Sequence, residues 1–320
     1  RAYPEPDSIP TENGGANFMF PQPVADDSVA AASSTAAYPW MDEITLAFAL
    51  DGLRERGLGA SPDRTDVLAV SLSTTDAVGH AFGPDSRELH DQVLRLDRYL
   101  GVFLDSLFAL RDQRRVVIAL TSDHGMMPLP AIRSRLYPNQ HAKIVSLAVP
   151  WRAFISRLVA AGVDTMAIDT EDAGVVVVRN PEAFAKVRVN MDSAIAAFGR
   201  EAKRLDGVLR ADLLIDLAKA DTTRDSIGRR WLHMFTPGGL VRLVVTLTEY
   251  SYWSPAAYAT HGSPHDGDAH VPMLFFGESV KPGKYKDFVR VVDMAPTLAE
   301  LLGVKPLEAL DGHVLRQAIK

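Results

Sequence analysis

The chain has 320 residues, of which 47% are hydrophobic and 23% charged, and its 34 Lys and Arg against 40 Asp and Glu give a formal net charge of -6. This composition is typical of a globular protein and excludes a disordered, collagenous or coiled-coil chain. The mild acidity argues against a nucleic-acid partner, and no apolar run reaches the ~18 residues of a membrane span. Cysteine is absent, which excludes disulfides, thiolate metal sites and a Cys nucleophile.

The N-terminal segment is polar and rich in Pro. It begins at Arg1 with R-A-Y-P-E-P-D-S-I-P, without an initiator Met or a signal-peptide pattern, so we expect the chain to start partway through a larger protein. We expect little periodic structure before Pro39. The pattern over 41–57 then predicts a helix that stops at Gly57. The apolar positions of this helix are Ile44, Leu46, Ala47, Ala49, Leu50 and Leu53.

Two strand-like runs flank a long helical pattern. V-L-A-V-S-L at 67–72 is nearly continuous in apolar residues, which predicts a strand buried on both faces. The segment 85–111 predicts an amphipathic helix that opens with a capping box of Asp85 and Glu88. A second buried strand follows at 115–121. Strand, helix and strand in this order form a βαβ unit, so we predict an α/β fold with a mostly parallel central sheet and helices on both faces.

The middle of the chain is less regular, and we interpret about 129–258 as an inserted cap or elaboration. Its candidate helices are 151–161, 181–205 and 224–235, and its candidate strands are 174–178 and 240–247. The alternating pattern then returns, with strand-like runs at 271–276 and 288–292 and a helix over 293–303. We expect residues 1–320 to be the C-terminal part of one domain whose sheet is incomplete at its N-terminal side.

Three short segments place metal-binding side chains next to predicted strands. The candidate ligands are Asp76 and His80 after the strand at 67–72, Asp123 and His124 after the strand at 115–121, and His261 before the strand at 271–276. Ligands of open α/β sheets bind at the carboxyl ends of the strands. A lone Asp-x-x-x-His or Asp-His-Gly is a weak signal, but three such segments, each in a strand context, are a strong one.

The residue types indicate the chemistry of this site. Imidazole and carboxylate are good zinc ligands, and a catalytic zinc keeps one position open. Two Asp and three His are too many for one such ion and suit a pair of metals, which clamp the attacking and leaving oxygens of phosphoryl transfer. Gly79, Gly125 and Gly262, beside the candidate ligands, are compatible with tight turns at strand ends.

The same segments carry a family resemblance. D-A-V-G-H-A-F-G-P-D-S-R-E-L, L-T-S-D-H-G, T-H-G-S-P-H-D-G-D-A-H-V-P-M-L-F-F-G and the tail V-V-D-M-A-P-T-L-A-E-L-L-G-V resemble the alkaline phosphatase superfamily. The branch they resemble most is that of bacterial alkaline phosphatases related to type I phosphodiesterases and nucleotide pyrophosphatases. The resemblance is dense over 40–128 and 255–315 and implies an alkaline-phosphatase-like fold.

The resemblance also implies two zinc ions in the full-length protein. Asp76, His80 and His261 match the three ligands of one zinc, and Asp123 with His124 match two ligands of the other. The family's remaining Asp ligand and its Thr or Ser nucleophile lie upstream of the region that matches the start of this chain. We therefore expect this chain alone to be inactive and to hold one zinc or none, with the missing segment present in a longer protein or as a separate piece.

The resemblance favours zinc-dependent hydrolysis of small phosphate monoesters by the full-length protein, in the periplasm or outside the cell. Phosphodiester or nucleotide pyrophosphate cleavage is one alternative, and a non-catalytic metal-binding remnant of the superfamily is another. Sulfatases and phosphoglycerate mutases share the architecture more remotely.

Other polar residues have less specific signals. His265 and Asp268, like Asp266 and His270, either orient the ligands or belong to a solvated loop. Thr74 and Thr75 lie beside a candidate ligand, but the family places its nucleophile elsewhere. Four further histidines have no motif partner, and we expect them on the surface or satisfied in the core: His90, His141, His233 and His313. The aromatic run E-Y-S-Y-W-S-P before His261 either lines a pocket or packs in the core, which is the commoner fate.

Overall fold

The computed structural model describes residues 3–171, 174–256 and 258–320, which form two compact units. Unit 1 contains the described residues up to Ser8, Asn17–Gly125 and His270–Lys320, and unit 2 contains Ile9–Ala16 and Met126–Ala269. Whether 129–258 is an insertion within a single domain stays a prediction. Among the helices of the described ranges, none combines the length and the apolar composition that a membrane crossing requires.

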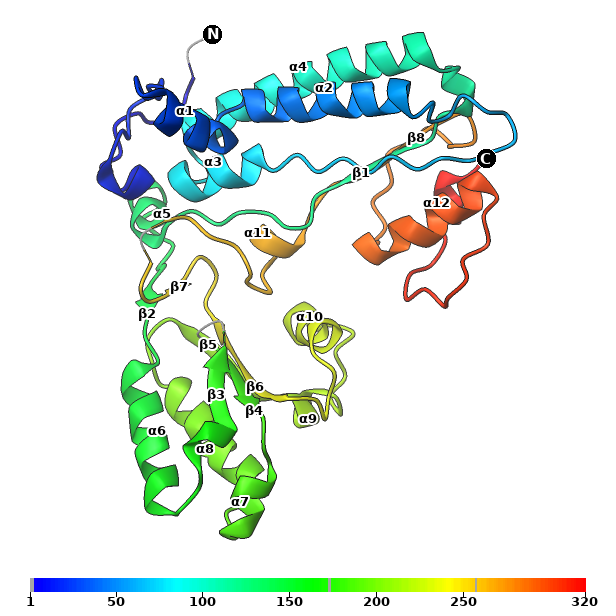
Figure 1. Cartoon of the computed structure of the whole chain (residues 1–320). Coiled ribbons are helices and arrows are strands. Elements are labelled where there is room, and N and C mark those ends of the chain that lie inside the picture. Colours follow the sequence, from blue (N-terminus) through cyan, green and yellow to red (C-terminus); the bar gives the residue numbers. More distant parts are fainter. Residues whose placement is uncertain (1–2, 172–173, 257) are drawn as a thin grey trace. The chain divides into compact units, whose positions relative to one another are not determined.

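Unit 1 consists mainly of helices beside a pair of strands (Figure 1). Its elements are α1 (Ser28–Ser34), α2 (Trp40–Glu55), α3 (Thr74–Phe82), α4 (Arg87–Leu110), β1 (Ile118–Thr121), β8 (Met273–Phe276) and α12 (Met294–Leu302). Helices α2 and α4 run side by side, and α3 packs against α4 (Figure 1). Helix α1 was not expected from the sequence. Asp27 caps it by accepting hydrogen bonds from the N–H groups of Val29 and Ala30.

The predicted helix over 41–57 is confirmed as α2, although its buried face differs from the prediction. Leu46, Ala49, Leu50 and Leu53 are buried, as expected from their spacing. Ile44, by contrast, is 53% exposed, and the position that continues the buried face toward the N-terminus is Asp42, which is 1% exposed. A carboxylate therefore occupies a core position of an otherwise apolar helix face.

Helix α4 confirms the long amphipathic helix, but its cap is not the predicted one. The helix begins at Arg87, and the Ser86 hydroxyl accepts a hydrogen bond from the Leu89 N–H at 3.1 Å. The cap is therefore Ser86 rather than Asp85, because Ser86 is the residue whose oxygen reaches a free amide of the first turn. Glu88 is buried instead and accepts a hydrogen bond from Gln22 Nε2 at 2.8 Å.

The apolar run at 67–72 does not form the buried strand that its composition predicts. Within the described ranges no strand pairs with it, and Val67 and Leu68 are 77% and 40% exposed. An apolar run becomes a buried strand only where neighbours cover its backbone edges and both its faces. The two predicted strands at 67–72 and 115–121 therefore do not form the expected βαβ unit within the described ranges. The expectation of a strand at 288–292 was also wrong, because a 3-10 helix occupies Val291–Asp293.

The two strands of unit 1 form an antiparallel pair. β1 pairs with β8 in the register Ile118↔Phe276 through Thr121↔Met273. The predicted strands at 115–121 and 271–276 are confirmed, each in shortened form, and the predicted helix over 293–303 is α12. Gly303 ends α12 in a left-handed conformation with φ 65°, which glycine adopts without strain.

Unit 2 is built around a four-stranded antiparallel sheet in the order β3-β4-β6-β5. Its strands are β2 (Ile144–Val145), β3 (Ile168–Glu171), β4 (Val175–Val178), β5 (Val208–Leu213), β6 (Val241–Leu247) and β7 (Tyr252–Trp253). Its helices are α5 (Pro130–Leu136), α6 (Ala148–Ala160), α7 (Glu182–Lys186), α8 (Met191–Ala202), α9 (Leu214–Leu217), α10 (Ser226–Met234) and α11 (Asp266–Ala269). The short strands β2 and β7 pair in parallel outside this sheet.

Both faces of the unit 2 sheet are covered, which explains the unbroken valines of β4. Val176 and Val178 pack with Phe154 of α6 and Phe198 of α8 on one face. On the other face Val175 and Val177 pack with a cluster from α9 and α10 that includes Trp231. The candidate strands at 174–178 and 240–247 are thus confirmed. The candidate helix over 181–205 is interrupted between α7 and α8, where Arg188 has φ 57°.

The buried carboxyl of Glu88 predicts a pH-dependent stability. Burial raises the pKa of Glu88, and the hydrogen bond from Gln22 opposes the rise in part. A carboxyl whose pKa is raised by folding contributes stability at low pH that is lost as the pH rises through the folded-state pKa. Glu88→Gln keeps an oxygen for Gln22 and removes the charge, so it should increase the free energy of unfolding at pH 8. That gain should shrink as the pH falls toward 4 in urea unfolding followed by circular dichroism, and an equal effect at both pH values would contradict the assignment.

Candidate metal centre

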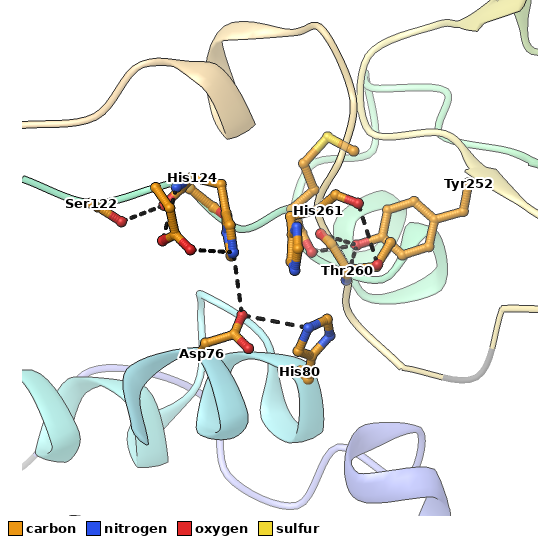
Figure 2. A network of polar contacts seen from close by, with 10 residues as sticks. Asp76, His80, Ser122, His124, Tyr252, Thr260 and His261 are labelled. Carbon is orange, nitrogen blue, oxygen red and sulfur yellow. Dashed lines mark hydrogen bonds and ion pairs between the residues drawn. The ribbon is translucent and has the colours of Figure 1, made fainter. Parts of the chain in front are cut away.

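Helix α3 positions the first two predicted ligands. Asp76 lies in its first turn and His80 lies four residues later, so both side chains project from one face. The Asp76 Oδ1 and His80 Nε2 atoms are 3.4 Å apart, and both side chains are partly exposed (Figure 2). The expectation that Gly79 forms a turn at a strand end was wrong, because Gly79 is buried within α3. The turn is made by Gly83, whose φ of 87° ends the helix.

The second pair of predicted ligands follows β1 directly, as expected. His124 Nε2 lies 3.8 Å from Asp76 Oδ1 and 3.6 Å from Asp123 Oδ2. Unit 1 therefore brings together four of the five predicted ligands: Asp76, His80, Asp123 and His124. The Asp76 carboxylate lies between the two imidazoles, with dashed contacts to both in Figure 2. Asp123 is the most exposed of the four, with 87% of its side chain accessible.

The backbone sets the tautomer of His124. Its Nδ1 atom is 2.7 Å from the carbonyl oxygen of Gly125. A carbonyl only accepts hydrogen bonds, so Nδ1 carries a proton and donates it. In the neutral imidazole the lone pair is then on Nε2, the atom that faces Asp76 and Asp123. This is the arrangement of a metal-binding histidine, whose other nitrogen is held by a hydrogen bond.

The spacing of these atoms fits a zinc ion. Zinc binds imidazole nitrogen at about 2.0–2.1 Å and carboxylate oxygen at about 2.0–2.2 Å in tetrahedral geometry, which places two donor atoms roughly 3.4 Å apart. The separation of Asp76 and His80 is 3.4 Å, as expected for two ligands of one ion, and the 3.8 Å between Asp76 and His124 is longer. The two carboxylates and two imidazoles offer N and O donors without sulfur, which suits zinc and related divalent ions.

His261, the fifth predicted ligand, belongs to unit 2, where the segment before it is firmly anchored. Thr260 forms an antiparallel bridge with Met127, and the Met127 N–H donates to the Thr260 carbonyl at 3.0 Å. The Tyr252 hydroxyl accepts a hydrogen bond from the Thr260 N–H at 3.0 Å and donates one to the Met127 carbonyl (Figure 2). Gly262 follows His261 with φ 104°, so the chain turns sharply just after the predicted ligand.

Tyr252 anchors this region, and the sequence did not predict that role. The aromatic run that contains it was expected to pack or to line a pocket, and Tyr252 is indeed 2% exposed in a cluster with Met127 and Leu129. Burial raises the pKa of its hydroxyl, which therefore stays protonated and can donate. The sequence signal was its place in the aromatic run E-Y-S-Y-W-S-P that leads to His261.

The loop after His261 is held by the side chains that were proposed to orient ligands. The Ser263 N–H donates to Asp268 Oδ2 at 2.7 Å, and Asp268 is 2% exposed. His265 is buried, with Nε2 2.8 Å from the Leu247 carbonyl oxygen. Asp266 is exposed and pairs with Arg230 at 2.6 Å. The Ser263 contact fixes the backbone two residues after the predicted ligand, and the contacts of His265 and Asp266 hold the loop four and five residues after it.

The remaining histidines lie outside the centre. His141, His233, His270 and His313 are exposed, and His90 Nδ1 is 2.8 Å from Glu5 Oε1. Thr74 is buried at the start of α3, and Thr75 accepts a hydrogen bond from Gln92 at 3.2 Å. Both threonines therefore help to anchor the first turn of α3.

The anchor at Tyr252 predicts a measurable loss of stability. Tyr252→Phe removes the hydroxyl and leaves the Met127 carbonyl and the Thr260 N–H without that partner, at a cost of about 1–3 kcal/mol for a buried group. Urea unfolding should show this decrease, and hydrogen exchange should show faster exchange at Thr260. Tyr258→Phe is the matched control, because Tyr258 is 51% exposed and should unfold like the wild type. Equal stability of Tyr252→Phe and wild type would contradict the role of the hydroxyl.

Comparisons with known proteins show the family of this chain. The family model for type I phosphodiesterase / nucleotide pyrophosphatase matches residues 16–223. A protein named calcium-transporting ATPase from Myroides odoratus is 30% identical over 287 residues, which cover 88% of this chain and 51% of that protein. Alkaline phosphatase PhoV from Synechococcus elongatus is 29% identical over 297 residues, which cover 90% of this chain and 51% of that protein. The chain thus spans about half the length of the curated relatives it matches.

The solved structures agree on the fold. The crystal structure of wild-type alkaline phosphatase PafA superposes with a TM-score of 0.83 at 23% identity, covering 94% of this chain and 57% of that one. This match confirms the predicted alkaline-phosphatase-like α/β fold. Together with the family model it also confirms the predicted resemblance. The chain belongs to the type I phosphodiesterase / nucleotide pyrophosphatase family, in the alkaline phosphatase superfamily.

Proposed function

We propose that the whole protein hydrolyses phosphate monoesters at a centre of two zinc ions. The observation that carries the proposal is the position of Asp76 between two imidazoles in unit 1, where Asp76 Oδ1 is 3.4 Å from His80 Nε2 and 3.8 Å from His124 Nε2. Asp123 Oδ2 lies 3.6 Å from the same His124 nitrogen. Relatives named alkaline phosphatase support hydrolysis of phosphate esters as the class of reaction.

The proposal assigns the ligands in two groups. Asp76, His80 and His261 would hold one zinc, and Asp123 with His124 would contribute to the second. When bound, the ions supply positive charge that stabilises the attacking and leaving oxygens of phosphoryl transfer. The Gly125 carbonyl keeps the Nε2 lone pair of His124 directed toward the two carboxylates, and α3 holds Asp76 and His80 on one face. These residues bind and orient, and we propose that a Thr or Ser nucleophile outside the 320 residues completes the site.

A second candidate is cleavage of phosphodiesters or nucleotide pyrophosphates at the same centre. The family model that matches residues 16–223 favours it, since that family is described by these activities. The ratio of rates on p-nitrophenyl phosphate and bis(p-nitrophenyl) phosphate separates the two candidates, and we expect the monoester to be the better substrate. We also propose a periplasmic or extracellular location, which fractionation of the source cells tests.

The proposal predicts that metal and activity are lost together. His80→Ala and Asp123→Ala in the whole protein should each lower the zinc content measured by mass spectrometry. They should also lower kcat/KM on p-nitrophenyl phosphate by at least about 10²-fold, because a ligand that holds a catalytic ion accounts for several kcal/mol of transition-state stabilisation. His233→Ala changes an exposed histidine on α10 and should leave both values unchanged.

Two outcomes would contradict this assignment. One is a whole protein that hydrolyses the ester at full rate after dialysis against a chelator. The other is a His80→Ala protein with wild-type zinc content and wild-type kcat/KM. A protein that binds zinc at these residues and hydrolyses neither substrate would instead be the non-catalytic member of the superfamily.

A further inference from the structure

The helix that carries Asp76 and His80 has no local cap. Ser73 occupies the N-cap position of α3, but its side chain makes no capping hydrogen bond. The free N–H of Thr74 is met by a residue distant in sequence, because Asp42 Oδ1 of α2 accepts it at 3.3 Å. A carboxylate at this end of a helix also interacts favourably with the helix dipole.

The second oxygen of Asp42 fixes a third helix. Gln92 of α4 donates from Nε2 to Asp42 Oδ2 at 2.8 Å and also to Thr75 Oγ1 at 3.2 Å. Asp42 and Gln92 are 1% and 0% exposed. One carboxylate therefore ties α2 and α4 to the first turn of α3, and all of these contacts lie within unit 1.

A buried carboxylate is costly unless hydrogen bonds satisfy it. Asp42 continues the face of α2 that buries Leu46 and Leu50, where an apolar residue would be the ordinary occupant. Asp42 accepts one hydrogen bond directly from the turn that contains Asp76. Its other partner, Gln92, donates to Thr75 of that same turn. The start of α3 sets the direction in which Asp76 and, one turn later, His80 leave the helix.

We propose that Asp42 is a positioning residue of the metal centre, which holds the first turn of α3 in place and thereby preorganises Asp76 and His80 for the metal. This inference rests on the proposed function, since it concerns the affinity of the same centre. The positioning depends on the geometry of the hydrogen bonds. Residue 42 must therefore supply a hydrogen-bond acceptor, but it need not carry a negative charge.

The test is the zinc affinity of the whole protein, measured by competition with a chromogenic chelator. The zinc ion that matters is the one whose binding His80→Ala weakens. Asp42→Ala should weaken this zinc binding by about 10- to 100-fold, as is usual when a side chain that orients ligands is removed. Asp42→Asn should stay within about threefold of wild type. Its Oδ1 still accepts from Thr74, and the Gln92 amide can rotate to present Oε1, which has no hydrogen-bond partner within the described residues.

A matched control separates positioning from mere stability. Leu53→Ala removes a buried contact from the same helix about three turns away, where Leu53 is 5% exposed. It should lower the Tm, as Asp42→Ala does, and leave the zinc affinity unchanged. Asp51→Ala removes an exposed carboxylate of α2 and should change neither value.

The outcomes distinguish this inference from the proposed function. If His80→Ala binds zinc like the wild type, the proposed metal centre itself is wrong. If His80→Ala weakens zinc binding while Asp42→Ala lowers only the Tm, the positioning role of Asp42 is wrong. It is also wrong if Asp42→Asn loses as much affinity as Asp42→Ala.

Discussion

The four-residue spacing of a helix is the constraint on which the centre in unit 1 depends. Because α3 is helical from Thr74 to Phe82, Asp76 and His80 share one face, and their donor atoms lie 3.4 Å apart. His124 then approaches the same carboxylate from the loop after β1. The site is thus assembled from one rigid helix and one strand end, which are elements that hold side chains more precisely than a long loop does.

Much of this arrangement follows from the sequence because it is local. The periodic apolar residues of α2, α4 and α10 indicate helices with one apolar face. The unbroken valines of β4 indicate a strand that is covered on both sides. The candidate ligand segments were also recognisable, because Asp76 with His80 and Asp123 with His124 are close in the chain. Their convergence was predicted from sheet topology, yet a helix rather than a strand end carries the first pair.

The rest depends on contacts between distant segments, which no local pattern encodes. Whether 67–72 becomes a buried strand depends on the presence of neighbouring strands, and its composition alone cannot supply them. Asp42 and Tyr252 have their effects through partners 32 and 125 residues away. The sequence does contain one weak indication of Asp42. Its carboxylate lies on the same helical face as Leu46 and Leu53 of α2, at a position that is ordinarily apolar.

The exposed apolar segment 67–72 has a consequence for strand pairing. Val67 and Leu68 are accessible, and no strand within the described ranges occupies their backbone edges. Such an edge is a template on which a further strand can add. An apolar composition and two open edges together make this segment the part of unit 1 that is best suited to accept one.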